Sequence, residues 1–190
     1  RNISNLIRNQ TAQETVSWSN YLRYVRRPQN IGDATTSGLE LEAKFRLDQA
    51  MDGALPVELR ANAAFFTSRV KGIPGPDNRL DQQAKATANL GADYRLRSLP
   101  LTVGASLNWT PANTVQESLL QANSTPVKRV LDAFASWNFD ANTLLRLSAS
   151  NVLAQDYNTA SLITTDTQRI RTDNLGRSFT AWQLRLEMKL

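Results

Sequence analysis

The chain has 190 residues, and its 22 Lys and Arg against 17 Asp and Glu give a net charge of +5. It contains no cysteine and no histidine, which excludes thiol chemistry, disulfides, the commonest metal ligand and the usual general base near neutral pH. An enzyme could still use carboxylates, Lys or Ser, but we do not expect enzymatic activity. We also expect no cofactor. The basic residues are interspersed with acidic ones instead of forming the runs typical of nucleic-acid binding.

Apolar and polar side chains alternate along most of the chain with a period of two, which places the apolar residues on one face of a β-strand. The pattern is weak in the first two segments and strong afterwards, where Phe134 is an exception, and it predicts about eight strands and no long helix. In chain order the predicted strands are Asn2–Asn9, Trp18–Arg27, Leu39–Leu47, Val57–Phe65, Ala86–Leu96, Leu101–Trp109, Leu131–Phe139, Leu145–Ser150 and Trp182–Leu190.

The strong strands are about 9–13 residues long, close to the 9–11 that a tilted membrane strand requires and longer than strands of soluble sheets. The connections between them alternate in length, as in outer-membrane barrels with short turns on one rim and long loops on the other. The short ones are Asp48–Pro56, Arg97–Pro100 and Asp140–Thr143, and the long ones, expected to be loops, are Lys71–Gln83, Pro111–Pro126 and Val152–Ser178.

The aromatic residues predict where a bilayer would end. If neighbouring strands run in opposite directions, one outward-facing set lies near the short turns and the other near the long loops. Between the sets the strands carry Ala, Leu and Val, which is the pattern of two aromatic girdles around an aliphatic band. The alternative is that these are core aromatics of a soluble β protein. The short-turn set is Phe45, Tyr94, Trp137 and Phe139, and the long-loop set is Phe65, Trp109 and Trp182.

Three motifs carry a family resemblance. The run S-G-L-E-L-E-A-K-F-R-L (Ser37–Leu47), preceded by Asn30–Ala34, resembles a hallmark of TonB-dependent outer-membrane receptors. Asn151–Tyr157 is similar to the penultimate-strand motif of that family. The last strand resembles its C-terminal assembly signal, although that signal normally ends in an aromatic residue and this chain ends in Leu190.

The resemblance implies that residues 1–190 are the C-terminal portion of a receptor barrel: an all-β, antiparallel, up-and-down transmembrane segment of about eight strands from a 22-stranded barrel. The family's N-terminal plug domain and first strands are not found in this sequence. The implied function is active import of a ferric siderophore or similar large, scarce nutrient across the outer membrane of a Gram-negative bacterium. The implied partners are outer-membrane lipid and lipopolysaccharide, the plug, the TonB complex acting through it, and the barrel-assembly machinery acting on the last strand.

Arginines in two segments are candidates for ligand contact, because a guanidinium group matches the geometry of carboxylate, catecholate or phosphate groups. Equally, they could be solvated or touch lipopolysaccharide phosphates. The last long connection carries Arg169, Arg171 and Arg177, and the early segment carries Arg23, Arg26 and Arg27.

Three other classes of protein compete with the receptor interpretation. A complete eight-stranded outer-membrane barrel could act as an anchor, an adhesin or a narrow pore. A soluble lipocalin-like carrier would point the apolar residues inward. An outer-membrane lipase or protease is disfavoured, because the chain has neither His nor a G-x-S-x-G motif.

Overall fold

The computed structural model describes residues 1–189, and most of them lie in β-strands. Within this range no helix is long and apolar enough to cross a bilayer. The elements are β1 (Asn2–Ile3), β2 (Ile7–Val16), β3 (Ser19–Asn30), β4 (Ala34–Arg46), α1 (Leu47–Ala50), β5 (Val57–Val70), β6 (Ala86–Arg95), β7 (Leu101–Thr110), β8 (Asn113–Gln116), β9 (Gln121–Thr125), β10 (Lys128–Asn138), β11 (Thr143–Ser150), β12 (Tyr157–Thr164), β13 (Arg169–Gly176) and β14 (Ala181–Met188).

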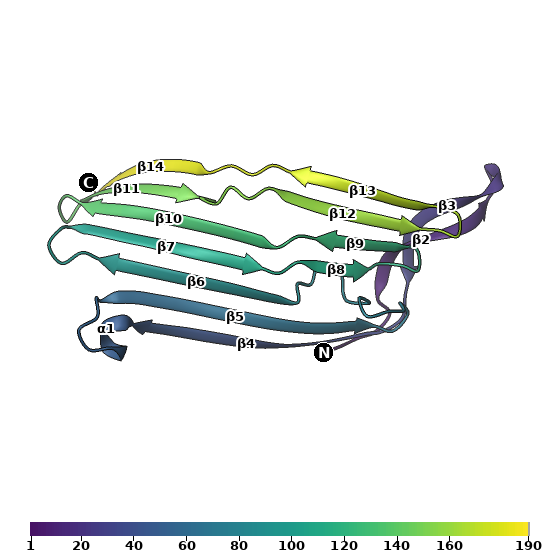
Figure 1. The fold of residues 1–190 in the computed structure, drawn as a ribbon, viewed down its shortest axis with the longest axis horizontal. Helices are drawn as coiled ribbons and strands as arrows, with labels where there is room; N and C mark the ends of the chain where they lie inside the picture. Colours follow the sequence, from purple (N-terminus) through teal and green to yellow (C-terminus); the bar gives the residue numbers. More distant parts are fainter. Residues whose placement is uncertain (190) are drawn as a thin grey trace.

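The main sheet has eight strands in the order β1-β4-β5-β6-β7-β10-β11-β14 (Figure 1). Every neighbouring pair in it is antiparallel, which confirms the predicted up-and-down arrangement. The sheet is open, because β1 and β14 are its two edges and are not paired with each other. No closed apolar cavity of the lipocalin kind is therefore formed by the part of the chain that the structure describes.

The predicted strands from Leu39 onward are confirmed, with ends displaced by a few residues. The strand predicted at Asn2–Asn9 is wrong, because residues 4–6 divide it into β1 and β2 and Asn5 has a positive φ of 55°. Leu47 is also not in a strand: it begins the four-residue helix α1 in the first short turn. Leu190, the predicted end of the last strand, lies outside the described residues.

Two of the long connections are not simple loops, contrary to expectation. Pro111–Pro126 contains β8 and β9, and Val152–Ser178 contains β12 and β13. These strands form a second, four-stranded sheet in the order β13-β12-β9-β8. It prolongs the strands of the main sheet beyond the end at which the long connections lie (Figure 1). The third long connection, residues 71–85, has no strand.

The strand register confirms that the main sheet has one apolar and one polar face, because directly paired residues of an antiparallel sheet point to the same side. On one face Leu41 pairs with Ala63 and Ala135 with Leu147. On the other face Ser136 pairs with Arg146. We call these the outer and inner faces. By continuation of the register, the outer face carries Leu41, Leu59, Leu90, Val103, Ala135, Leu147 and Leu186, and the inner face carries Glu42, Arg60, Asn89, Gly104, Ser136, Arg146 and Arg185.

The outer face carries both aromatic sets. On β5 Phe65 lies six positions after Leu59, the partner of Phe45, a distance of about 20 Å along the strand. On β7 Trp109 likewise lies six positions after Val103, the partner of Tyr94. That these rows mark the two interfaces of a bilayer stays a prediction.

Phe134 interrupts the alternation because it lies on the inner face. It pairs with Gly104, where an added Cβ would lie only 2.4 Å from the ring. The guanidinium carbon of Arg146, on β11, lies 4.0 Å from the centroid of the Phe134 ring. A glycine opposite it and a cation over it therefore accommodate an aromatic ring on an otherwise polar wall.

The strands that enter the second sheet are interrupted along one line. Pro111 and Pro126 break two of them, since proline has no N–H for the ladder, and Asn151 and Ala154, with positive φ, break a third. Across this line the side chains change sides. At the end of β7 Trp109 faces outward and Thr110 faces inward. Asn113 follows Thr110 by three residues and would face outward in an uninterrupted strand, but both residues line the same cavity on the inner side.

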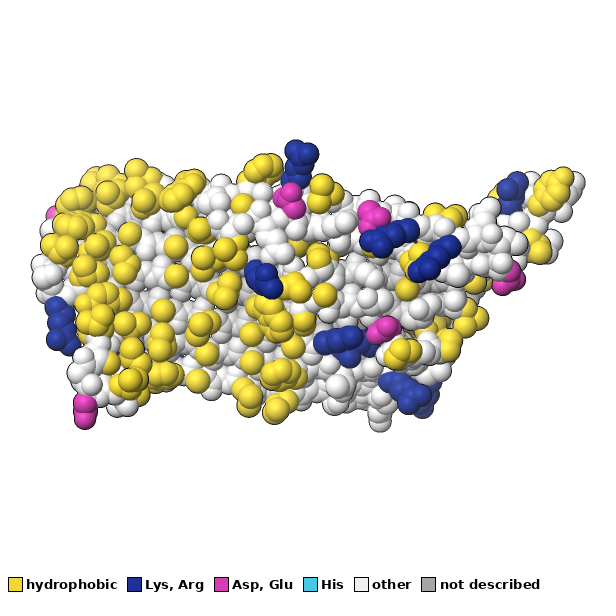
Figure 2. All heavy atoms as spheres, viewed as in Figure 1, with side chains coloured by type: hydrophobic (Ala, Val, Ile, Leu, Met, Phe, Trp, Pro, Cys, Tyr) yellow, Lys and Arg dark blue, Asp and Glu magenta, His cyan; other side chains and the backbone are white. Residues whose placement is uncertain are grey.

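The two ends of the molecule differ in surface character. Figure 2 shows apolar side chains covering the main sheet on the face in view, whereas Lys, Arg, Asp and Glu gather over the second sheet and the β2–β3 hairpin. Because a charged side chain is costly in lipid, we expect the second sheet to lie outside the hydrocarbon region of a bilayer.

We expect that a charge on the outer face of β14 destabilises the protein. Leu186→Arg should cost about 2–4 kcal/mol in a bilayer, because a midplane Arg on the lipid face must be desolvated. Gln183→Arg on the inner face should cost far less. The measurement is a lipid-refolding titration of both variants, and equal losses would contradict lipid contact at Leu186.

Candidate ligand-binding site

The β2–β3 hairpin folds over the inner side of the second sheet. Thr11 on β2 donates a hydrogen bond to Gln121 on β9 (3.1 Å), and Gln121 in turn donates to Ser161 on β12 (3.2 Å). Gln10 donates to the carbonyl oxygen of Glu117 (2.5 Å). Side chains of β2 therefore fasten the hairpin directly to β9 and to the β8–β9 turn, and through Gln121 to β12.

Arg8 is the centre of this contact. Its side chain is only 4% exposed and forms an ion pair with Asp81 at 2.7 Å. The guanidinium group also donates to the carbonyl oxygens of Arg79 (2.8 Å) and Gln116 (3.3 Å). One buried cation therefore joins the hairpin, the 71–85 loop and β8.

The 71–85 loop is held in place on both sides. Asn78 donates to the carbonyl oxygens of Val70 (3.1 Å) and Ile73 (2.8 Å), and Arg79 donates to that of Phe66 (2.7 Å). Asn113 on β8 donates to the carbonyl oxygen of Gln83 (3.2 Å). A small apolar cluster beneath the loop joins it to the base of the hairpin and contains Ile3, Leu6, Ile31, Ala34, Val70, Ile73 and Leu80.

These parts surround a partly open cavity of about 670 Å³ at the long-loop end, on the inner side, with charged, polar and apolar residues in its lining. Its size falls within the range of small-molecule sites. We call it the loop-end cavity. It is lined by Ile7, Arg8, Asn9, Arg26, Asp81, Gln82, Ala84, Thr110, Pro111, Asn113, Val115, Glu117, Asn123 and Thr125.

The two carboxyl groups of the cavity, those of Asp81 and Glu117, have raised pKa values. Burial raises the pKa of Asp81, and this effect exceeds the lowering by nearby Arg8 and Arg26. Burial also raises the pKa of Glu117, and the charge of Asp81 raises it further. These two effects exceed the lowering of the pKa by Arg26, Asn123 and Arg8. Both groups therefore take up protons at a higher pH than solvated carboxyl groups do.

Acceptor atoms around the cavity lack partners. Oε2 of Glu117, Oδ1 of Asn113 and Oε1 of Gln83 are buried without a hydrogen bond within residues 1–189, and the nearest guanidinium nitrogen of Arg26 is 3.6 Å from Glu117 Oε2. The cavity thus offers guanidinium groups that could bind acidic groups. Residues 1–189 contain no cluster of His, Cys, Asp or Glu that could hold a metal ion.

Five of the six arginines named from the sequence do not line the cavity. Arg23 bonds Ser19 Oγ (2.9 Å) near the hairpin tip, and Arg27 pairs with Glu14 (2.5 Å). Arg171 makes a two-nitrogen contact with Asp173 on β13. Arg169 and Arg177 are exposed at and beyond the ends of that strand. Of the early arginines named from the sequence, Arg26 is the one that reaches the cavity.

Sequence reasoning missed Arg8, Asp81 and Glu117. Arg8 lies in a segment with weak alternation, and the two acids lie in connections expected to be loops. No local pattern marks them, because their proximity comes from contacts between residues 71 to 108 positions apart.

Replacing Arg8 should release the hairpin. Arg8→Ala leaves Asp81 and two carbonyl oxygens without their partner, which we expect to cost about 3 kcal/mol. Amide hydrogen exchange in β2 and β3 should then become about a hundredfold faster, since each 1.4 kcal/mol is a factor of ten. Arg27→Ala is the control, because its half-exposed pair should contribute less than about 1 kcal/mol. Unchanged exchange in Arg8→Ala would contradict the anchoring role.

A family described as TonB dependent receptor-like, beta-barrel, matches residues 1–152, which include β1 to β11 and the start of the Asn151–Tyr157 motif. No curated protein matches the chain. No solved structure matches it either. The two-faced antiparallel sheet agrees with the family match, and the chain therefore belongs to the TonB-dependent receptor β-barrel family, an outer-membrane family of Gram-negative bacteria whose members are in general receptors and transporters, not enzymes.

Proposed function

We propose that the chain forms part of an outer-membrane receptor that actively imports a ferric siderophore or a similar large, scarce nutrient, with energy supplied through TonB. The observation that carries this proposal is the loop-end cavity. It lies on the inner side of the sheet, at the end that in such barrels faces the cell exterior. A solute captured there would already be on the side of the wall that leads inward.

The exposed cation of the cavity, Arg26, suits an acidic group of a chelate. Arg8 is committed to Asp81 and two carbonyl groups, whereas the side chain of Arg26 is 55% exposed and 3.6 Å from its acid partner. We therefore assign the direct contact to Arg26, with Arg8 shaping the wall. Arg23, Arg27, Arg169, Arg171 and Arg177 would meet the solute before it enters.

Residues 1–190 would be the C-terminal portion of the barrel, with the remaining strands and the plug supplied by other parts of the receptor. The two unpaired edges of the main sheet support this reading, because a sheet edge in lipid has backbone groups without partners. The inner face carries ion pairs such as Lys44 with Glu58 (2.8 Å) and Arg60 with Asp93. A wet lumen or a polar plug surface suits such a wall.

The alternative is a complete eight-stranded barrel acting as an anchor, adhesin or narrow pore. The eight-stranded main sheet is the observation in its favour. Against it, β1 contributes only two residue pairs to that sheet, so a closed barrel made from these strands would have one wall that is almost missing.

The proposal is tested by uptake in a receptor-deletion strain that expresses the full receptor. A panel of labelled ferric chelates and cobalamin should include one compound whose uptake is restored and is lost when the proton-motive force is collapsed. Arg26→Ala should weaken binding of that compound about tenfold, the usual effect of losing one charge-assisted contact. Arg97→Ala, at the opposite end of the sheet, is the control.

Two results would contradict the proposal. One is uptake that persists without the proton-motive force, as expected for a pore. The other is an Arg26→Ala variant that binds as the wild type does, which would move ligand contact to the exposed arginines such as Arg171.

Acidification should strengthen binding of an anionic ligand. Arg8, Arg26, Asp81 and Glu117 together carry no net charge when both acids are ionised. Because the pKa values of Asp81 and Glu117 are raised, these acids lose their charge first as the pH falls, and the cavity becomes positive. Calorimetric titrations from about pH 8 to about pH 5 should show rising affinity before ordinary carboxyl groups are protonated.

Glu117→Gln should raise the affinity at neutral pH and flatten this dependence, since it removes one titrating charge. Glu14→Gln, which lies outside the cavity, is the matched control. Affinity that falls on acidification would contradict the assignment of an anionic ligand.

A further inference from the structure

One row of paired residues on the main sheet carries three arginines. Arg95 on β6 pairs with Thr102 on β7, and Thr102 pairs with Ser136 on β10. Ser136 pairs in turn with Arg146 on β11, and Arg146 pairs with Arg185 on β14. Because directly paired residues point to the same face, these five side chains form a line across five strands. We call this line the arginine row.

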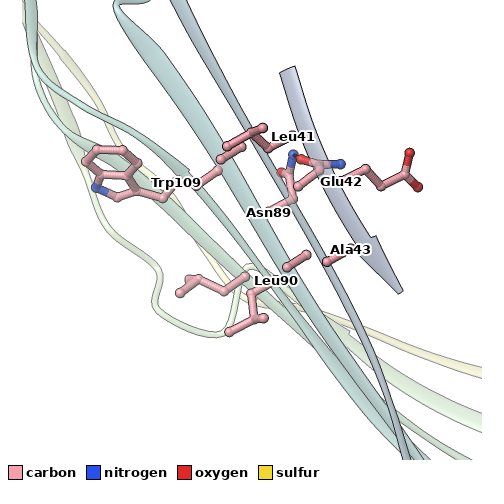
Figure 3. Close-up of a pocket in the computed structure, with 11 residues that line it drawn as sticks. Leu41, Glu42, Ala43, Asn89, Leu90 and Trp109 are labelled. Carbon is pink, nitrogen blue, oxygen red and sulfur yellow. Dashed lines mark hydrogen bonds between the residues drawn. The ribbon is translucent and has the colours of Figure 1, made fainter. Parts of the chain in front are cut away.

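The arginine row lies on the inner face. Figure 3 shows Glu42 and Trp109 pointing to opposite sides of the strands, and the register places the row on the side of Glu42. On β7 Thr102 lies eight positions before Thr110, which lines the loop-end cavity, a distance of about 26 Å along the strand. The row is therefore on the same wall as the cavity and nearer to the short turns.

Two guanidinium groups of the row belong to directly opposed residues. Neighbouring strands are about 4.8 Å apart, and like charges that face each other across two strands destabilise a sheet. The pair is Arg146 and Arg185. A single acid, Glu187, forms an ion pair with Arg185 at 3.0 Å. An anion between the two arginines would relieve their repulsion.

The other acids on this part of the inner face already have partners. Asp93 pairs with Arg60, and Asp132 accepts a hydrogen bond from the backbone N–H of Asn151 at 2.8 Å. Within residues 1–189 no carboxylate forms an ion pair with Arg95 or with Arg146. The row therefore has an excess of positive charge that the described residues do not neutralise.

The ring of Phe134 holds the guanidinium group of Arg146 in place. The guanidinium carbon lies 4.0 Å from the ring centroid, and the ring fits against the wall because Gly104 opposite it has no Cβ. A cation–π contact orders the cation without an acid, so its N–H donors stay available to an anionic ligand. The aromatic exception on this polar wall thus positions one cation of the row.

We propose that the arginine row is a second anion-binding site, which receives the carboxylate groups of the imported solute after the solute leaves the loop-end cavity. Arg146 and Arg185 hold one carboxylate through paired N–H donors. Arg95 lies three strands from Arg146, about 14 Å away at the backbone, and meets a second acidic group of a large solute. This inference rests on the proposed import function for the identity of the occupant.

The test is a calorimetric titration of the purified full receptor with citrate, a tricarboxylate that represents the acidic part of such a solute. Arg26→Ala is the parent protein, because this change removes the contact assigned to the loop-end cavity. Adding Arg146→Gln or Arg185→Gln should weaken citrate binding about tenfold, the effect of losing one charge-assisted contact. Adding Phe134→Leu should weaken it about threefold through loss of the cation–π contact, whereas Phe134→Tyr should bind as the parent does.

Arg129→Gln is the matched control, because it removes an arginine without an ion pair from the outer face and should leave citrate binding unchanged. Equal citrate affinity of the parent and the Arg146→Gln variant would overturn the proposal. So would a parent that binds no citrate and an Arg146→Gln variant that unfolds at a lower temperature, since acidic side chains of the receptor itself would then occupy the row. Neither result touches the import proposal, which depends on uptake driven by the proton-motive force with Arg146 unchanged.

Discussion

The structure depends on the lack of water in the hydrocarbon part of a bilayer, where each backbone N–H and C=O group must find a partner within the protein. Antiparallel pairing from β4 through β14 meets this requirement within the main sheet, and only its two edges leave backbone groups without partners. The same pairing makes every second side chain face lipid. Directly paired residues on the outer face are accordingly apolar through most of the sheet, as with Leu90 and Leu107. Among the main-sheet strand residues that the structure describes, the outward charges are Arg69 and Arg129, and both lie at the long-loop end.

Beyond the line of breaks this constraint no longer applies. Proline is tolerated at positions 111 and 126, the side chains change sides, and charged residues such as Arg171 and Asp173 stand together on exposed strands. The second sheet is freed from lipid contact and can turn polar groups inward. That change of side brings Asn113 and Asn123 into the lining of the loop-end cavity.

A buried arginine is an expensive way to hold a loop, since desolvation of the cation offsets much of its attraction to an acid. At Arg8 the cost is reduced by two carbonyl acceptors in addition to Asp81. Such an arrangement fixes the geometry of the cavity wall more than it adds to stability. Rigid walls favour selectivity, because a ligand must match donors and acceptors that cannot move to accommodate another.

The sequence by itself determined the strands of the main sheet from β4 onward, their two faces and even the exception at Phe134, because a period of two is a local property that a bilayer makes strict. It also indicated the family through the run at Ser37–Leu47. The sequence did not determine the second sheet, since its strands are short, lie outside lipid and follow no alternation that a bilayer enforces. The candidate site was decided by tertiary structure alone: Arg8 meets Arg79 and Gln116 across 71 and 108 residues, and contacts between such distant positions leave no trace in the local pattern of either segment.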